Sequence, residues 1–153
     1  MRFGAFGFRK ADTGGYNNFY LDSSFGSWGE CARFRADGMF YFNSGFGSSG
    51  VAYACRAWVQ FNGGSASIAG SGNVSSITRN GTGDYTINFS NSMPDTNYSV
   101  TGSCGRNGSG ANANIFTVAD NLSAPATGSV RVKMFWDNGT ATDIDMVSAA
   151  IFR

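Results

Sequence analysis

Histidine is absent from this chain of 153 residues, proline occurs only twice, and charged residues make up 14% of the sequence. An average globular domain carries roughly 25% charged residues. The absence of histidine removes the residue type that most often serves as a general base, a pH switch or a metal ligand. With a net charge of +1 and no basic stripe, the chain is not expected to bind nucleic acid.

Long apolar segments are also missing. No stretch approaches about 18 apolar residues, and the N-terminal segment MRFGAFGFRK holds no continuous apolar run. We therefore expect neither a signal peptide nor membrane insertion.

Cysteine is scarce, and Cys31, Cys55 and Cys104 have no CxxC or zinc-like spacing. An odd count argues against a complete disulfide framework. We interpret the three residues as buried free thiols of a protein assembled in a reducing cytosol, with a Cys55–Cys104 bridge as the alternative. Without histidine or a cysteine cluster, we expect no metal site and no cofactor.

The chain is rich instead in glycine, with 22 residues, and in aromatic residues, at 15%. Gly, Asn, Ser and Thr interrupt every window long enough for a helix, whereas short runs of period two recur. The pattern predicts an all-β protein. With so few charges, solubility must come from Ser, Thr and Asn, or from burial of surface against other copies of the chain.

The first fifty residues hold 13 of the 23 aromatic residues. Arg33–Arg35 and Met39–Phe42, separated by Asp37–Gly38, predict a hairpin. Shorter strands are expected at Phe3–Phe8 and Phe19–Leu21. A dozen large rings need a surface to pack on, either the rest of the chain or neighbouring copies. Polar, glycine-containing connections are expected at Thr13–Asn18 and Asn43–Gly50.

The remainder of the chain, residues 51–153, predicts a β-sandwich or jelly-roll-like module of about eight strands. Tyr85, Ile87 and Phe89 alternate with polar residues and are expected to face the core. Val130, Val132, Met134 and Trp136 alternate with Arg131, Lys133 and Phe135, and the first four are expected to face the core in the same way. Turns are expected at Asn80–Gly81, Met93–Asp95 and Asp137–Gly139. The expected strands are Ala54–Phe61, Ser65–Ile68, Asn73–Thr78, Tyr85–Phe89, Asn97–Cys104, Asn114–Ala119, Val130–Trp136 and Asp143–Phe152.

Several motifs in order resemble the C-terminal region of phage tail-fibre-like proteins. They are RFRADGMFYFNSGFGS, CRAWVQFNGG, GSGNVSSITRNGTGDYTINFSNSMPDTNYSV and the closing VSAAIFR, and the resemblance covers residues 32–153. It implies a homotrimeric structural protein of the virion, assembled in the host cytoplasm, in contact with other tail or capsid proteins, and available for host attachment. It implies no catalytic residue. The alternative is a capsid decoration or cement protein.

Under this resemblance, residues 1–50 form an aromatic-rich β segment that anchors the protein or packs between subunits, or adds strands to the same core. Residues 51–153 form the fibre-tip-like module. Such fibre proteins usually carry a long N-terminal shaft, whereas only about fifty residues precede the module here. The chain is therefore expected to be a separately encoded tip or a small decoration protein.

If the module binds a host-surface polysaccharide, its loops supply the candidate residues, because sugar sites combine planar aromatics with Asn, Asp and Arg. The long polar loop Ser103–Asn114 is the most suggestive, although loops of this kind are more often ordinary surface. The candidate ligand-binding residues are Arg79, Asn80, Asp95, Asn97, Arg106, Asn107, Asn112, Asp137 and Asn138.

Two further patterns have a structural and a functional interpretation. Trp58 and Trp136 could be stacking surfaces for a sugar, but their apolar strands favour core packing. Asp143 and Asp145 could hold a cation or supply half of a glycosidase pair, but a solvated strand edge is favoured. Polysaccharide cleavage needs two carboxylates roughly 5–9.5 Å apart, and nothing in the sequence pairs the aspartates. We assign no catalytic residue.

Overall fold

The structure is a computed structural model that describes residues 7–10, 17–20, 32–34, 39–42, 50–105, 114–119 and 124–153. The chain divides into two units, residues 1–53 and residues 54–153. All regular structure in the described residues is β-strand, which confirms the predicted all-β class. No helix long and apolar enough to cross a membrane occurs in this described part.

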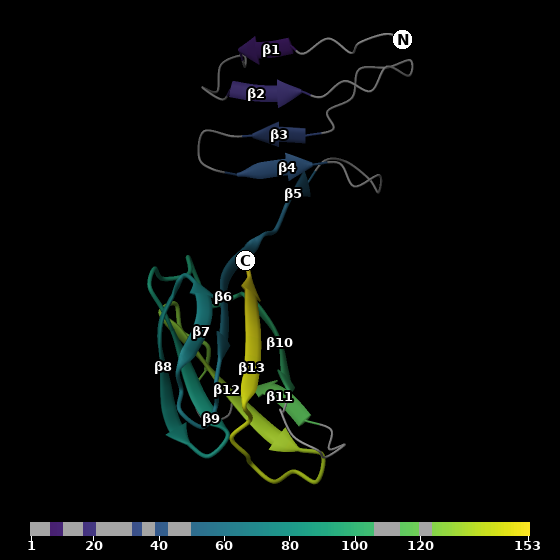
Figure 1. The fold of residues 1–153 in the computed structure, drawn as a ribbon. Coiled ribbons are helices and arrows are strands. Elements are labelled where there is room, and N and C mark those ends of the chain that lie inside the picture. The colour runs from purple at the N-terminus through teal and green to yellow at the C-terminus, as the bar shows by residue number, and fades with distance from the viewer. Residues whose placement is uncertain are drawn as a thin grey trace. The chain divides into compact units, whose positions relative to one another are not determined.

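The N-terminal unit holds two small antiparallel sheets (Figure 1). β1 (Gly7–Lys10) pairs with β2 (Asn17–Tyr20), and β3 (Ala32–Phe34) pairs with β4 (Phe40–Phe42), which also pairs with β5 (Gly50–Val51). The pairing of β3 with β4 confirms the predicted hairpin. The turn of this hairpin lies outside the described residues. The same holds for parts of the other predicted segments, namely residues 3–6, 13–16, 21 and 43–49.

Aromatic side chains of β4 lie at the surface of this unit. The rings of Phe40 and Phe42 stack with centroids 6.3 Å apart and planes 9° from parallel. They are 36% and 46% exposed, and the neighbouring Met39 is 44% exposed. These three apolar side chains therefore keep a large part of their surface in contact with solvent.

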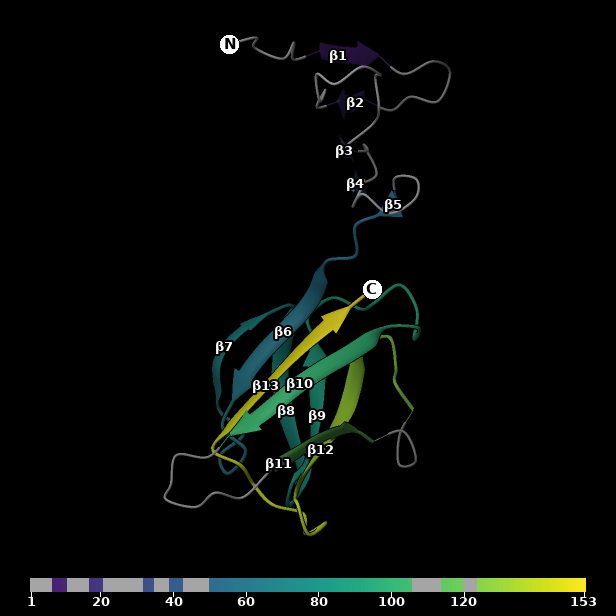
Figure 2. The same cartoon turned by 90° about the vertical axis from the view of Figure 1, so that its right-hand side faces the viewer.

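The C-terminal unit is a sandwich of two four-stranded antiparallel sheets (Figures 1 and 2). We call the first the β6 sheet, and its strands in spatial order are β10 (Ser99–Gly105), β13 (Met146–Phe152), β6 (Cys55–Phe61) and β7 (Ile68–Gly72). We call the second the β9 sheet, and its strands are β11 (Asn114–Val118), β12 (Ser129–Trp136), β9 (Asp84–Phe89) and β8 (Val74–Gly81). These eight strands confirm the predicted sandwich.

The core lies between the two sheets and is formed by alternate residues of each long strand. Phe61 of the β6 sheet packs edge-on against Tyr85 of the β9 sheet, with ring centroids 5.2 Å apart. Of the seven residues predicted to face inward from β9 and β12, six are buried and Trp136 is half-buried. The fully enclosed side chains include Val59, Phe61, Tyr85, Ile87, Val130, Val132, Met134, Ile144, Val147 and Ile151.

Several predicted elements have other limits in the structure, and two of them show the cause. Ser65 lies in a turn and β7 begins only at Ile68, because Asn62 Oδ1 accepts hydrogen bonds from Ser65 N at 3.0 Å and Ser65 Oγ at 3.2 Å. The turn expected at Asn80–Gly81 falls later, because β8 continues through Gly81 and the left-handed residue is Gly83, at a φ of 65°.

Candidate binding site

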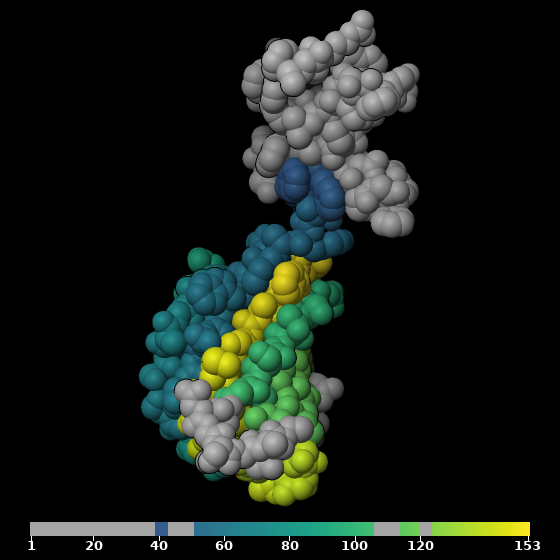
Figure 3. All heavy atoms as spheres, turned by 45° about the vertical axis from the view of Figure 1, so that its right-hand side comes forward, coloured from purple at the N-terminus to yellow at the C-terminus, as the bar shows by residue number. Residues whose placement is uncertain are grey.

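A hollow of about 460 Å³ lies on the outer face of the β6 sheet. It crosses β13 between β6 on one side and β10 on the other, and Figure 3 shows this face with β13 in yellow between β6 in teal and β10 in green. We call it the Trp58 groove, and its lining residues are Trp58, Val59, Gln60, Thr101, Gly102, Ser103, Ser148, Ala149 and Ala150.

Strand register explains why the groove is hollow. Ala150 of β13 lies between Trp58 and Thr101, and Ser148 lies between Gln60 and Ser103. Neighbouring strands are about 4.8 Å apart, so β6 and β10 are separated by about 10 Å across β13. Because Ser148 and Ala150, the outward residues of β13 within the groove, are small, the space above this part of the strand stays open.

Trp58 is exposed over 48% of its surface, so the prediction that it packs in the core is wrong. The buried residues of β6 are Ala57, Val59 and Phe61, which places Trp58 on the opposite face of the strand. The apolar run in this segment hid the alternation. Trp136, the other tryptophan considered, is half-buried.

The indole of Trp58 lies over two glycines of β7. A Cβ on Gly72 would come within 2.5 Å of the indole Nε1, and a Cβ on Gly70 within 3.3 Å of Cη2 at the other end of the ring. The long axis of the ring therefore follows β7, and any larger residue at Gly72 would displace it. Two glycines with the same outward direction thus leave the space that this exposed aromatic ring occupies.

Four polar side chains surround the indole and Ala150: Gln60, Thr101, Ser103 and Ser148. Within the part of the chain that the structure describes, none of the four side chains has a hydrogen-bond partner. Gln60, Thr101 and Ser103 are exposed and Ser148 is half-buried, so these side chains are accessible to a ligand.

The outer face of the β9 sheet is different, because its polar side chains bond to one another. Asn88 Nδ2 donates to Ser76 Oγ at 3.1 Å and to Thr78 Oγ1 at 3.0 Å. Arg131 donates two hydrogen bonds of 2.7 Å to Asp84. These bonds from Arg131 lower the pKa of the Asp84 carboxyl. This face is a closed polar network, whereas the Trp58 groove is not.

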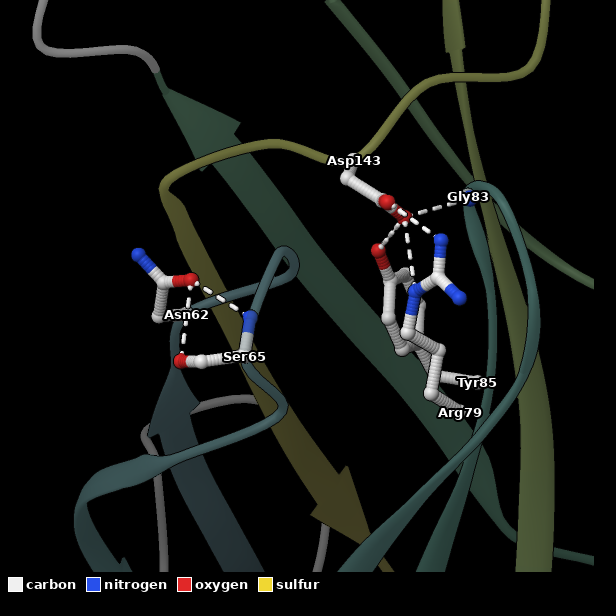
Figure 4. A network of polar contacts seen from close by, with 6 residues as sticks. All are labelled: Asn62, Ser65, Arg79, Gly83, Tyr85 and Asp143. Carbon is white, nitrogen blue, oxygen red and sulfur yellow. Dashed lines mark hydrogen bonds and ion pairs between the residues drawn. The ribbon is translucent and has the colours of Figure 1, made fainter.

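A second network closes one end of the sandwich around Asp143 (Figure 4). Its carboxylate accepts hydrogen bonds from Gly83 N at 2.9 Å, from Arg79 Nη2 at 2.6 Å and from the Tyr85 hydroxyl. Desolvation acts to raise the pKa of Asp143, but these donors outweigh it and the pKa is lowered. The contacts hold Asp143 against the β8–β9 turn.

The predicted strand at Asp143–Phe152 therefore begins late, at Met146, and Asp143 and Asp145 do not form an alternating strand edge. Asp143 is paired with Arg79, whereas Asp145 is exposed. No group of three or more His, Cys, Asp or Glu residues that could hold a metal ion occurs among the described residues.

The loop residues predicted as ligand contacts lie at both ends of the sandwich. Arg79 and Asn80 lie at the end of β8, and Asp137 and Asn138 lie in the turn after β12, at the same end (Figure 1). Asn80 Nδ2 donates to Thr86 Oγ1 at 2.9 Å, and Asn138 Oδ1 accepts from Thr140 N at 3.0 Å.

Asp95 and Asn97 lie at the opposite end, between β9 and β10, where Asp95 accepts hydrogen bonds from Arg153 and from Asn97 N. The Arg153 guanidinium lowers the pKa of Asp95. Arg106, Asn107 and Asn112 lie outside the described residues.

The described members of the predicted set do not converge on one site, and none of the predicted ligand-binding residues lines the Trp58 groove. The signal that could have located the groove is the alternation of outward Ser, Thr and Gln along β10, β13 and β6.

The two described cysteines are free, as predicted, but they are not fully buried. Cys55 and Cys104 are free thiols, Cys55 is exposed and Cys104 is half-buried, while Cys31 lies outside the described residues. Cys55 lies opposite Phe152 and Cys104 opposite Val147, so they flank β13 far apart along its length and form no bridge. Desolvation raises the pKa of the Cys104 thiol.

Comparison with known proteins gives a likeness in fold. No family model matches the chain, and no curated protein sequence matches it. A solved structure, the phiAB6 tailspike in complex with three-repeated oligosaccharides of Acinetobacter baumannii surface polysaccharide, matches with a TM-score of 0.51 at 16% sequence identity. The match covers 99% of this chain and 28% of the tailspike chain. The chain thus shares a fold with about a quarter of a phage tailspike.

Proposed function

We propose that this protein is a structural component of a bacteriophage virion, a tail-fibre or tailspike-tip module that attaches the particle to polysaccharide on the host surface. The observation that carries the proposal is the Trp58 groove, an exposed aromatic ring beside polar groups that have no partner among the described residues. The likeness in fold to the phiAB6 tailspike supports the class of protein.

We further propose that the module is a homotrimer in which residues 1–50 pack between subunits or against another virion protein. The exposed Met39, Phe40 and Phe42 support this role, because association would remove their apolar surface from water. Three identical modules would turn weak single contacts into avidity. The loop residues Arg79, Asn80, Asp95, Asn97, Arg106, Asn107, Asn112, Asp137 and Asn138 stay predicted as further contacts.

The proposed attachment is non-catalytic. A general acid for glycoside cleavage needs a raised pKa. The carboxyls of Asp84, Asp95 and Asp143 each accept hydrogen bonds from an arginine, and their pKa values are lowered. We expect host polysaccharide to keep its chain length when it is incubated with the full-length protein, and shortened chains would contradict this part of the proposal.

The proposal is tested by the location and the mass of the protein. Antibodies against the full chain should label virions at the tail, whereas labelling confined to the capsid would favour a decoration protein. The soluble full chain should also block adsorption of the phage to its host. In native mass measurement we expect about three times the 16.2 kDa of one chain. A stable monomer at micromolar concentration would contradict the trimer.

A further inference from the structure

We infer that the Trp58 groove is a subsite for one or two uncharged pyranose residues, with a sugar ring lying against the indole of Trp58. The inference rests on the proposed function for the source of the glycan, and it adds the position of the site and the chemical class of its ligand. Three features of the groove carry it: the ring, the polar groups beside it and the absence of charge.

The ring offers an exposed apolar surface. Trp58 is 48% exposed, and its indole lies in the space that Gly70 and Gly72 leave on the outer face of β7. A pyranose carries C–H groups on one face and hydroxyls around its edge. Burial of that apolar face on the indole removes nonpolar surface of both partners from water.

The polar groups match the edge of a sugar. Gln60 carries an amide, and Thr101, Ser103 and Ser148 carry hydroxyls, which donate and accept hydrogen bonds as sugar hydroxyls do. None of these four side chains bonds to another side chain or to the backbone in the described part of the protein. A bound sugar therefore replaces water at these groups without breaking an internal hydrogen bond.

The lining restricts the charge of the ligand. None of its nine residues is charged, and Arg56 is the single charged residue in the four strands of the β6 sheet. A sugar with a carboxylate or sulfate would lose hydration in the groove without gaining an ion pair from any lining residue. The hollow of about 460 Å³ is within the size of small-molecule sites, roughly 300–1,000 Å³. Uncharged sugar residues satisfy both conditions.

The test measures binding of the full chain to an array of bacterial surface glycans sorted into neutral and acidic members. We expect binding to at least one neutral glycan, little change with added salt, and a loss of affinity of at least about tenfold in Trp58→Ala. Gln60→Ala is a second variant of the groove and is expected to lose about three- to tenfold. Trp58→Phe, which keeps a ring, should lose less than Trp58→Ala.

Two matched controls separate the groove from general surface effects. Ile115→Ala shortens an apolar side chain that is 45% exposed on β11 of the other sheet, and it should leave affinity unchanged. Arg56→Ala removes the single charge of the β6 sheet and should change affinity less than about twofold, because an uncharged ligand gains little from that charge.

Several outcomes would overturn the inference. They are binding of acidic glycans alone, binding of none of the array, and equal affinity of the wild-type and Trp58→Ala proteins. A change in native mass in Trp58→Ala would assign this face to contact between copies instead. Antibody labelling of the phage tail and block of adsorption by the wild-type chain together support the proposed function. If both are observed and Trp58→Ala blocks adsorption as well as the wild-type chain does, the inference fails and the proposed function stands. If antibodies do not label the tail and the wild-type chain does not block adsorption, the proposed function fails.

Discussion

At the scale of single residues, Asn73 shows how a polar side chain supports the fold. It has a φ of 57°, in the left-handed region, where Asn is tolerated better than other residues with a Cβ. Its Nδ2 donates to Arg56 O at 3.2 Å and to Asn91 O at 3.1 Å, and its Oδ1 accepts from Asn91 N at 2.8 Å. One side chain thus joins β6, the start of β8 and the loop after β9.

We expect Asn73→Ala to lower the free energy of unfolding by about 1–3 kcal/mol, because it removes these bonds and places a less tolerant residue at positive φ. Asn73→Gly accepts the backbone conformation but also lacks the side-chain bonds, so its loss should be smaller than that of Asn73→Ala. Urea unfolding of the full chain, followed by circular dichroism, measures both. Equal stability of wild-type and Asn73→Ala proteins would show that the side-chain bonds contribute nothing.

At the scale of elements, the β8–β9 turn depends on a glycine and on a distant carboxylate. Gly83 has a φ of 65°, and a Cβ there would lie 2.5 Å from Met134 O and 2.7 Å from Thr142 N. The same residue donates its N–H to Asp143. The turn, β12 and the segment before β13 are therefore packed together, and no larger residue fits at this position.

Gly83→Ala should destabilise the protein by more than about 2 kcal/mol, since backbone atoms cannot move as easily as a side chain. Two glycines provide controls in the same region. Gly139→Ala has a positive φ of 81° but open space, so a loss of about 1–2 kcal/mol is expected. At Gly81 an added Cβ meets nothing within 4 Å, so Gly81→Ala should change stability by less than about 0.5 kcal/mol. Equal losses in all three variants would contradict the steric argument.

At the scale of the whole molecule, the distribution of ionisable groups sets the response to pH. The chain has no histidine, so no side chain of that type titrates between pH 5 and 8. The pKa values of Asp84, Asp95 and Asp143 are lowered, chiefly by arginine hydrogen bonds at Asp84 and Asp95. Desolvation raises the pKa of Tyr98 to about 12, and desolvation with the contact to Asp143 also raises that of Tyr85.

The stability of the protein should therefore be nearly constant from about pH 5 to pH 8 and fall on both sides, with the raised pKa of the Cys104 thiol contributing to the alkaline loss. The lowered aspartate pKa values contribute stability above the unfolded value of about 3.9, and this is lost as the pH falls through the folded values. The raised tyrosine pKa values contribute stability below about pH 10, and this is lost as the pH rises through the folded values. Urea midpoints measured from pH 3 to pH 11 test this, and a slope near pH 6.5 would contradict it.

Much of the fold could be predicted from the amino-acid sequence, because alternation reports directly on burial. Polar residues between Tyr85, Ile87 and Phe89 leave one arrangement in which a strand buries its apolar side, and the same holds for Val130, Val132 and Met134. Strand limits were less accurate. Asn62, Gly83 and Asp143 set those limits through contacts with residues far away in the chain, and local propensity does not contain such contacts.

The sequence by itself determined the all-β class, the inward residues of the long strands and the absence of histidine chemistry. Tertiary structure alone decided the candidate site. Alternation along β6 sets the outward face of Trp58, but only the pairing of β6 with β7 and β13 places the residue over Gly72 and beside Ala150. The physical reason is that alternation specifies which face of a strand a residue takes, whereas a groove requires small residues on one strand between larger ones on its neighbours.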